Sequence, residues 1–256
     1  MTRSARLGLV WALLGAALLV AIVARPIPQD PAYHRFADTR TVWGIPNALN
    51  VVSNVAFVVV GALGMWTVWP KREDGPVRFA SPVERWPYVV FFGGFALTGF
   101  GSAYYHLAPG NETLVWDRLP LAITLMGLFA ATITDRISAK AGLVLLGPLV
   151  ALGIASVFWW TAGERRGEGD LRPYALVQFY PMLAIPLMAL LFSSRYTRGG
   201  DLVIVVVIYG LAKVFELLDV RLLSLGSLVS GHTCKHLAAA LSGYWLWRML
   251  VKRKPA

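Results

Sequence analysis

The residues best suited to chemistry are two histidines near the C-terminus, His232 and His236, which lie four positions apart. On an α-helix this spacing places both imidazoles on one face, one turn apart. Two neutral imidazoles in that arrangement form half of a site for a divalent metal. Because such pairs also arise by chance or in packed cores, the interpretation depends on further ligands at the same depth.

Further candidates lie upstream of this pair. Ser102 and His106 are also four apart, and the acid Asp117 follows soon after them. The chain has four histidines, and the one outside these two places, His34, lies in a proline-rich stretch that reads as an ordinary loop. Three histidines and an acid can supply the ligands and the proton acceptor of a catalytic metal site, provided that the fold brings them together.

Composition indicates a membrane protein that would position these residues on helices. Of the 256 residues, 57% are hydrophobic, and the mean hydropathy is +0.59. The apolar residues form runs of roughly 20, the length that crosses a bilayer core as a helix. The net charge of +10 comes mostly from Lys and Arg that flank these runs, which favours membrane topology over nucleic-acid binding. The single cysteine excludes an internal disulfide.

The apolar runs divide the chain into three parts, and we predict an all-α integral membrane protein with a seven-transmembrane-helix bundle plus one extra N-terminal apolar helix. Residues 1–25 form a membrane anchor, although a basic start and small residues near Ala24 also fit a cleaved signal segment. Residues 26–46 form an external loop, and residues 47–251 form the bundle. The predicted bundle helices are about 47–69, 87–106, 115–134, 141–161, 173–192, 202–222 and 228–251.

Two sets of polar residues interrupt the apolar helices. The first bundle helix carries a stripe of amides and a hydroxyl, which should face the bundle and form interhelical hydrogen bonds, with contact to a site as the alternative. The residues of this stripe are Asn47, Asn50, Ser53 and Asn54.

The second set lies in the helix over 202–222. There, Lys213 and Glu216 should pair, with Asp219 either in the same network or at the metal site.

Counting crossings places the candidates at one membrane level. The helix with Ser102 and His106 ends near His106, and the next helix begins on the same side with Asp117 near its start. Four crossings bring the chain back to that side, where the helix with His232 and His236 begins. The result is the same whether or not the first run is removed.

The distribution of basic residues orients the bundle. Fourteen Lys and Arg flank the end opposite the candidates, and eight flank the end that holds them. Because the cytoplasmic side carries the excess of positive charge, we predict a multi-pass protein of the cell membrane with a cytoplasmic C-terminus and a site facing the external or periplasmic side. The fourteen are Arg3, Arg6, Lys71, Arg72, Arg78, Arg85, Arg136, Lys140, Arg195, Arg198, Arg248, Lys252, Arg253 and Lys254.

The combination of Ser102-x-x-x-His106, Asp117 and His232-x-x-x-His236 on a seven-helix bundle resembles the alkaline ceramidase family, which is related to the adiponectin and progestin receptors. The resemblance covers about Asn47 to Trp247, and its strongest pieces are 99–106, 117–120, 50–54 and 232–245. It implies that His106, His232 and His236 are zinc ligands and that Ser102 and Asp117 are the other catalytic residues. It also implies a lipid substrate, with ceramide cleaved to a sphingoid base and a fatty acid.

The chemistry of the residues agrees with an amide hydrolase. Three histidines leave a fourth zinc position for water, whose pKa zinc lowers to about 7. Asp117 can accept the proton and pass it to a leaving amine. Ser102 can donate to the developing oxyanion or orient His106. The simpler alternatives are a packing role for Ser102 and an ion pair between Asp117 and Arg118.

Other functions and cofactors remain open at this stage. A receptor of the progestin and adiponectin type would use zinc structurally, and a zinc transporter would need ligands along a path through both leaflets. The family's calcium site would place one ligand at Asn47 and another near Asp38. Because an amide binds calcium less well than a carboxylate, the sequence argues against calcium. The sequence leaves acyl length, head group and oligomeric state undefined.

Overall fold

The structure, a computed structural model, describes residues 1–69, 78–226 and 228–256. Within these ranges the secondary structure consists of helices, short 3-10 turns and two isolated β-bridges, without a β-strand. The all-α prediction is therefore confirmed for the described part of the chain. Lys71 and Arg72, which were counted in the charge distribution, lie outside the described residues.

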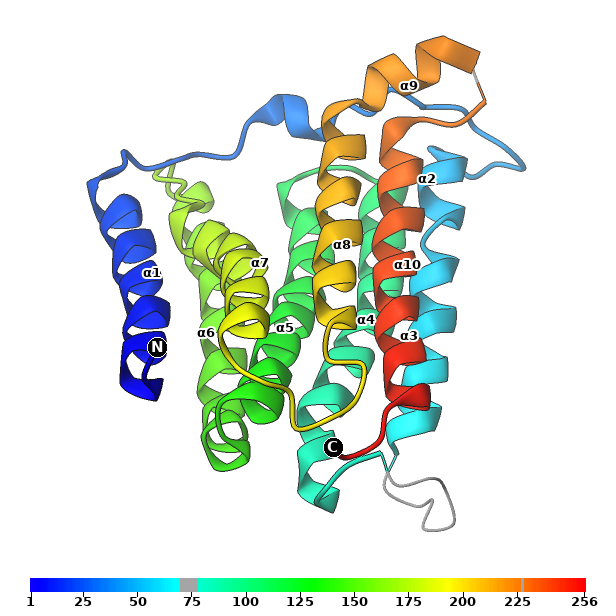
Figure 1. Ribbon diagram of the computed structural model, residues 1–256. Coiled ribbons are helices and arrows are strands. Elements are labelled where there is room, and N and C mark those ends of the chain that lie inside the picture. The colour runs from blue at the N-terminus through cyan, green and yellow to red at the C-terminus, as the bar shows by residue number, and fades with distance from the viewer. Residues whose placement is uncertain (70–77, 227) are drawn as a thin grey trace.

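The long helices run side by side and follow the predicted spans closely (Figure 1). Short connections link most of them, so consecutive helices alternate in direction, as expected for a bundle. The helices are α1 (Arg3–Val23), α2 (Ala48–Val52), α3 (Val55–Val68), α4 (Trp86–Leu107), α5 (Asn111–Arg136), α6 (Ala139–Arg165), α7 (Arg172–Leu191), α8 (Asp201–Leu217), α9 (Asp219–Gly226) and α10 (Gly231–Lys252).

The helix predicted over 47–69 is broken into α2 and α3 at Ser53 and Asn54. Both side chains bond to the carbonyl of Asn50, from the Ser53 hydroxyl at 3.1 Å and the Asn54 amide at 2.7 Å. Such side-chain hydrogen bonds compete with the helical backbone pattern. All four residues of the polar stripe are buried, as its spacing predicted.

The helix predicted over 202–222 is also divided into two. Helix α8 ends at Leu217, and α9 lies across the upper end of the bundle (Figure 1). The Asp219 carboxylate accepts hydrogen bonds from the backbone N–H groups of Ala37 and His232, at 2.9 and 2.8 Å. These bonds tie the turn after α8 to the N-terminal loop and to the start of α10.

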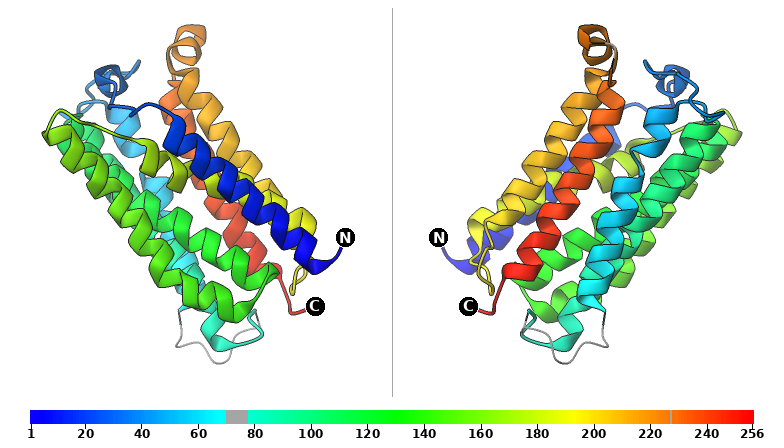
Figure 2. Two further views of the ribbon diagram at one scale, coloured as in Figure 1. Left: turned by 90° about the vertical axis from the view of Figure 1, so that its left-hand side faces the viewer. Right: turned by 90° about the vertical axis from the view of Figure 1, so that its right-hand side faces the viewer.

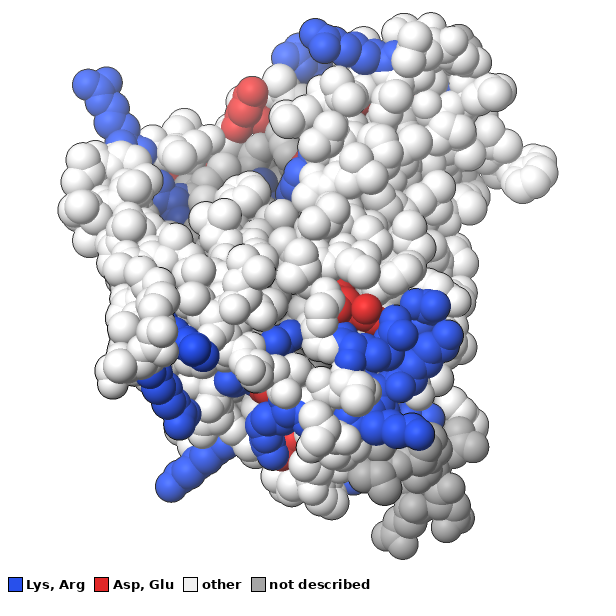
Figure 3. Space-filling model, viewed as in Figure 1, with Lys and Arg blue, Asp and Glu red and all other residues white. Residues whose placement is uncertain are grey.

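Several helices could cross a membrane, which fits an integral, multi-pass protein. Among the described residues, five helical stretches are long and apolar enough by length and composition: Arg3–Val23, Ala48–Val68, Asn111–Arg136, Ala139–Arg165 and Arg172–Leu191. On the face drawn in Figure 3, Lys and Arg gather toward the lower end, below a broad area that is mostly uncharged. The count of seven spans in the bundle stays a prediction.

Helix α1 lies outside the bundle against α7 (Figures 1 and 2). No residue of α1 is fully buried. Leu7, Val10 and Leu13 pack against the core, whereas exposed apolar residues such as Ile22 and Val23 are available to lipid. Arg6 donates to the carbonyl of Leu191 at 2.9 Å, and Arg172 donates to the carbonyl of Ala24 at 2.5 Å. These contacts at the two ends of α7 fit the predicted anchor.

A close crossing of α4 and α5 positions the candidate residues between them. A Cβ atom on Gly101 would overlap the carbonyl of Trp116, so only glycine allows the two backbones to approach this closely. Ser102 and Asp117 directly follow these two residues in sequence. The crossing therefore brings the candidate hydroxyl and carboxylate to neighbouring positions on adjacent helices.

Candidate metal centre

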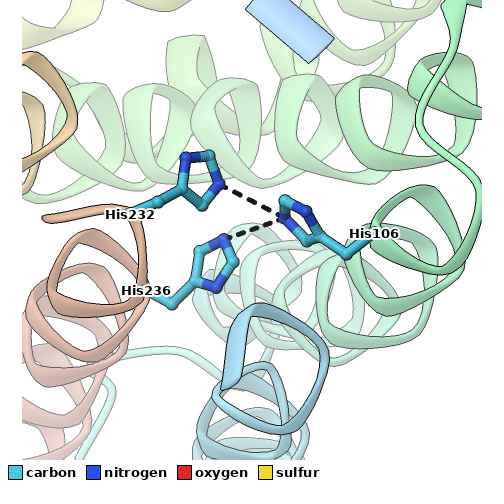
Figure 4. A group of neighbouring side chains, drawn as sticks. All are labelled: His106, His232 and His236. Atoms are coloured by element: carbon cyan, nitrogen blue, oxygen red, sulfur yellow. Dashed lines mark hydrogen bonds between the residues drawn. The ribbon is translucent and has the colours of Figure 1, made fainter. Parts of the chain in front are cut away.

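Three buried imidazoles meet at the upper end of the bundle, one from α4 and two from α10 (Figure 4). The Nε2 atom of His106 lies 3.3 Å from the Nε2 atoms of both His232 and His236. One potential ligand atom from each residue falls within 4.8 Å of the others. The predicted triad is thus assembled, and it is close enough to hold a metal ion, whose identity the geometry leaves open.

The first turn of α10 is fixed in a way that points its histidines toward α4. Ser230 caps this helix by accepting from the N–H of Thr233 at 3.2 Å, while Asp219 accepts from the N–H of His232. A Cβ atom on Gly231 would overlap the carbonyl of Phe215, so α10 can begin this close to the end of α8 only with glycine. Together these contacts set the position of both imidazoles.

The hydrogen bonds of Ser53 determine which nitrogen of His236 is available. The Ser53 hydroxyl donates to the Asn50 carbonyl, so its oxygen must accept the bond from Nδ1 of His236, at 2.7 Å. In a neutral imidazole with its proton on Nδ1, Nε2 carries a lone pair. That lone pair faces the other two imidazoles. Histidines that bind metals are commonly oriented by such a bond, so the donor set fits a metal ion.

Other residues around the triad fix its surroundings. The ring of Phe36 packs edge-on against His106 and His232, with centroid distances of 4.6 and 4.7 Å. Asn47 donates to the backbone carbonyl of His106 at 2.9 Å. The polar stripe therefore makes both kinds of contact that its sequence allowed, interhelical hydrogen bonds and contact with the site.

We expect Ser53→Ala to weaken metal binding without removing it. The substitution deletes the acceptor that holds the His236 proton on Nδ1, and loss of such an outer partner typically lowers metal affinity about 10–100-fold. A competition titration against a zinc chelator measures the change. Ser156→Ala is the matched control, because Ser156 is also buried but bonds to Gly153 within α6. Equal affinities for the two variants would contradict the role of Ser53.

Ser102 and Asp117 line a cavity beside the triad. The cavity has a volume of about 400 Å³, and His236 also forms part of its wall. Ser102 is buried on α4, and Asp117 is half-buried on α5. The two predicted catalytic residues and one triad histidine therefore share a single space. Most of the remaining wall is apolar, including Phe91, Phe95, Leu125, Leu128, Ile185 and Val205.

Two charged residues of this cavity, Lys235 and Arg118, have partners that the sequence did not indicate. The predicted pair of Lys213 and Glu216 is confirmed at 2.8 Å, and Lys235 of α10 joins it at 2.5 Å from Glu216. Lys235 lies three positions after His232, a helical spacing that could have placed it near the site. Arg118 bonds to Gln29 at 2.6 Å, and no ion pair with Asp117 is found among the described residues.

The remaining sequence candidates lie outside the triad. His34 bonds to the hydroxyl of Tyr105 at 2.9 Å and to Asn111 at 2.8 Å, which fits a loop residue that braces α4 and α5. Asp38, one candidate for calcium, is held by Arg40 through contacts of 2.8 and 2.7 Å. These hydrogen bonds lower the pKa of the Asp38 carboxyl from its ordinary value. Asn47, the other candidate, uses its amide nitrogen on His106.

Comparison with known proteins assigns the chain to no family. No protein-family model matches the chain, and no curated protein matches it significantly.

Proposed function

We propose that the chain is a zinc-dependent membrane hydrolase that cleaves the amide bond of an N-acyl lipid. The observation that carries the proposal is the cavity that Ser102, Asp117 and His236 share, whose remaining lining is mostly apolar. Its volume falls in the range of ligand pockets, and its wall suits an acyl chain. The ceramidase resemblance supports ceramide as the first substrate to consider.

The triad has the donor set of a catalytic zinc site. Three imidazoles suit zinc, which in catalytic sites keeps a fourth position for water or substrate. Bound there, zinc would acidify water and polarise the amide carbonyl. His106, His232 and His236 would hold the ion, and Ser53 would keep His236 in the required tautomer.

The residues around the amide then have separate tasks. Asp117 accepts a proton from the attacking water and delivers it to the nitrogen of the leaving amine. The Ser102 hydroxyl donates a hydrogen bond to the former carbonyl oxygen as negative charge develops on it. The water oxygen bonds to the carbonyl carbon, the carbon–nitrogen bond breaks, and a fatty acid and an amine leave.

The direct test is release of fatty acid by purified protein from a panel of lipids, including ceramide and N-acylethanolamine. We expect release that depends on zinc and stops after chelation. A receptor of the adiponectin and progestin type would retain zinc but release no fatty acid. A zinc transporter reconstituted in vesicles would move zinc across the bilayer, again without hydrolysis. Either of these results would overturn the proposal.

The proposal includes an orientation, with the triad facing the external or periplasmic side and the C-terminus in the cytoplasm. Figure 1 places the α6–α7 connection at the end where α10 begins, and His232 lies in the first turn of α10, whereas the C-terminus lies at the opposite end. Arg166→Cys should therefore react with a membrane-impermeant thiol reagent in intact cells, whereas Lys254→Cys should react only after lysis. Both positions are exposed, so the comparison is matched. The reverse labelling pattern would show that the protein has the opposite orientation in the membrane.

A further inference from the structure

The cavity contains more positive than negative charge. Its lining includes three basic residues, Arg118, Lys213 and Lys235, and two acids, Asp117 and Glu216. The described lining therefore carries one formal positive charge, before any metal ion is added. An uncompensated charge inside a bundle is costly, so such an excess in an otherwise apolar cavity calls for a partner.

Arg118 has the clearest unused hydrogen-bonding capacity in the cavity. Only 5% of the Arg118 surface is exposed, and the residue lines the cavity. One terminal nitrogen, Nη2, donates to Gln29, while Nη1 is buried without a hydrogen-bond partner in the part of the chain that the structure describes. The rings of Trp160 and Tyr174 hold the guanidinium in place, with centroids 4.3 and 5.0 Å from its carbon. The group is thus fixed in position with donor capacity left over.

The two lysines form a second cationic group. Glu216 pairs with both of them, through one carboxylate oxygen to Lys213 and the other to Lys235. One carboxylate cannot neutralise two ammonium groups, and each ammonium has three N–H donors. This cluster therefore also retains positive charge.

Tyr33 joins the two cationic groups into one site. Its hydroxyl donates to Glu216 at 3.3 Å, and its ring centroid lies 5.5 Å from the guanidinium carbon of Arg118. A single side chain thus touches Arg118 on one side and the lysine–glutamate cluster on the other. Asp117 is the neighbour of Arg118 in sequence, so this site adjoins the predicted proton acceptor.

We propose that Arg118, with Lys213 and Lys235, binds a carboxylate on the amine portion of the substrate, so that the preferred substrate is an N-acyl amino acid. This inference rests on the proposed function. Guanidinium and ammonium groups are the side chains that recognise carboxylates most strongly. In an N-acyl amino acid the carboxylate is separated from the amide nitrogen by a single carbon. Asp117 and Arg118 are adjacent in sequence and both line the cavity, so a substrate whose amide lies beside Asp117 would place its carboxylate near Arg118. Hydrolysis would add water across the carbon–nitrogen bond and yield a fatty acid and a free amino acid.

N-palmitoylglycine and N-palmitoylethanolamine form a matched pair of probes, because they share the acyl chain and the amide and differ in a carboxylate versus a hydroxymethyl group. We expect kcat/KM for N-palmitoylglycine to exceed that for N-palmitoylethanolamine by about 10–100-fold, the range for a hydrogen bond to a charged group. Equal values for the two lipids, or a preference for the neutral lipid or ceramide, would overturn the inference and leave the proposed hydrolase intact.

Substitutions test which residues of the cavity recognise the substrate carboxylate. Arg118→Gln should reduce this preference about 10-fold or more through KM for N-palmitoylglycine, while Arg118→Lys should restore part of it. Arg166→Gln is the matched control, because Arg166 is exposed and lies outside the cavity lining. If Arg118→Gln does not fold, Lys213→Gln provides the same comparison. An unchanged preference in the folded variant would refute the assignment.

A binding measurement separates this inference from the catalytic proposal. In metal-depleted protein, N-palmitoylglycine should bind at least about 10-fold more tightly than N-palmitoylethanolamine, because the carboxylate contact does not require hydrolysis. Tighter binding of the acidic lipid by metal-depleted protein, together with no hydrolysis of either lipid by zinc-loaded protein, would reject the hydrolase and keep the anion site. Equal binding of the two lipids would reject the anion site.

Discussion

His232→Ala should purify with little or no bound metal, because the two remaining imidazoles provide too few ligands to hold the ion tightly. Loss of an outer partner alone costs about 10–100-fold in affinity, so loss of a direct ligand should exceed about 100-fold. Elemental analysis after mild chelation measures zinc per chain. The expected values are about one for the wild type, from a single triad, and near zero for the variant.

His34→Ala is the control for this experiment. His34 is the chain's other histidine, and it contacts Tyr105 and Asn111 rather than the triad. This variant should keep its zinc even though it loses two part-buried hydrogen bonds. Full zinc occupancy in His232→Ala would show that the triad is not the binding site.

Asp117→Asn should keep its zinc and lose most of its activity. Asparagine preserves the size of the side chain, but it cannot accept a proton from water. A positioned acid–base group is usually worth about 10²–10⁴ in turnover, and the loss should fall in that range. The measurement is fatty-acid release from the best wild-type lipid, together with zinc content for both proteins.

Glu112→Gln provides the matched acid-to-amide control on the same helix. Glu112 lies in the first turn of α5, where it is exposed and pairs with Arg165 at 2.7 Å. Its substitution should leave both zinc content and turnover near the wild-type values. Wild-type turnover in Asp117→Asn would rule out Asp117 as the proton carrier, whatever the metal content.

Helix periodicity and the count of crossings predicted much of this arrangement. Because α-helices of about 20 residues connected by short loops alternate in direction, the sequence alone placed Ser102, Asp117 and the three histidines at one end. The His-x-x-x-His spacing then placed His232 and His236 on one face of α10. These inferences depend on regular geometry that each helix carries by itself.

The features that the sequence did not reveal depend on contacts between helices. The break at Ser53 arises from side-chain bonds to Asn50, and its importance lies in a bond to His236 on a distant segment. An ion pair of Arg118 with Asp117 was the simpler alternative to a catalytic Asp117, yet Arg118 bonds to Gln29 in the N-terminal loop. Neither partner can be inferred from helical spacing, because both belong to elements far away in the chain.

The two bonds of Asp219 have a thermodynamic consequence for the loop between α1 and α2. One carboxylate holds both the N–H of Ala37 in that loop and the N–H of His232 at the triad. Phe36, next to Ala37, packs against two of the three imidazoles. Ordering the loop and binding an ion are therefore coupled equilibria, and such coupling is reciprocal. An ion in the triad should stabilise the ordered loop by the same free energy by which the ordered loop raises affinity for the ion.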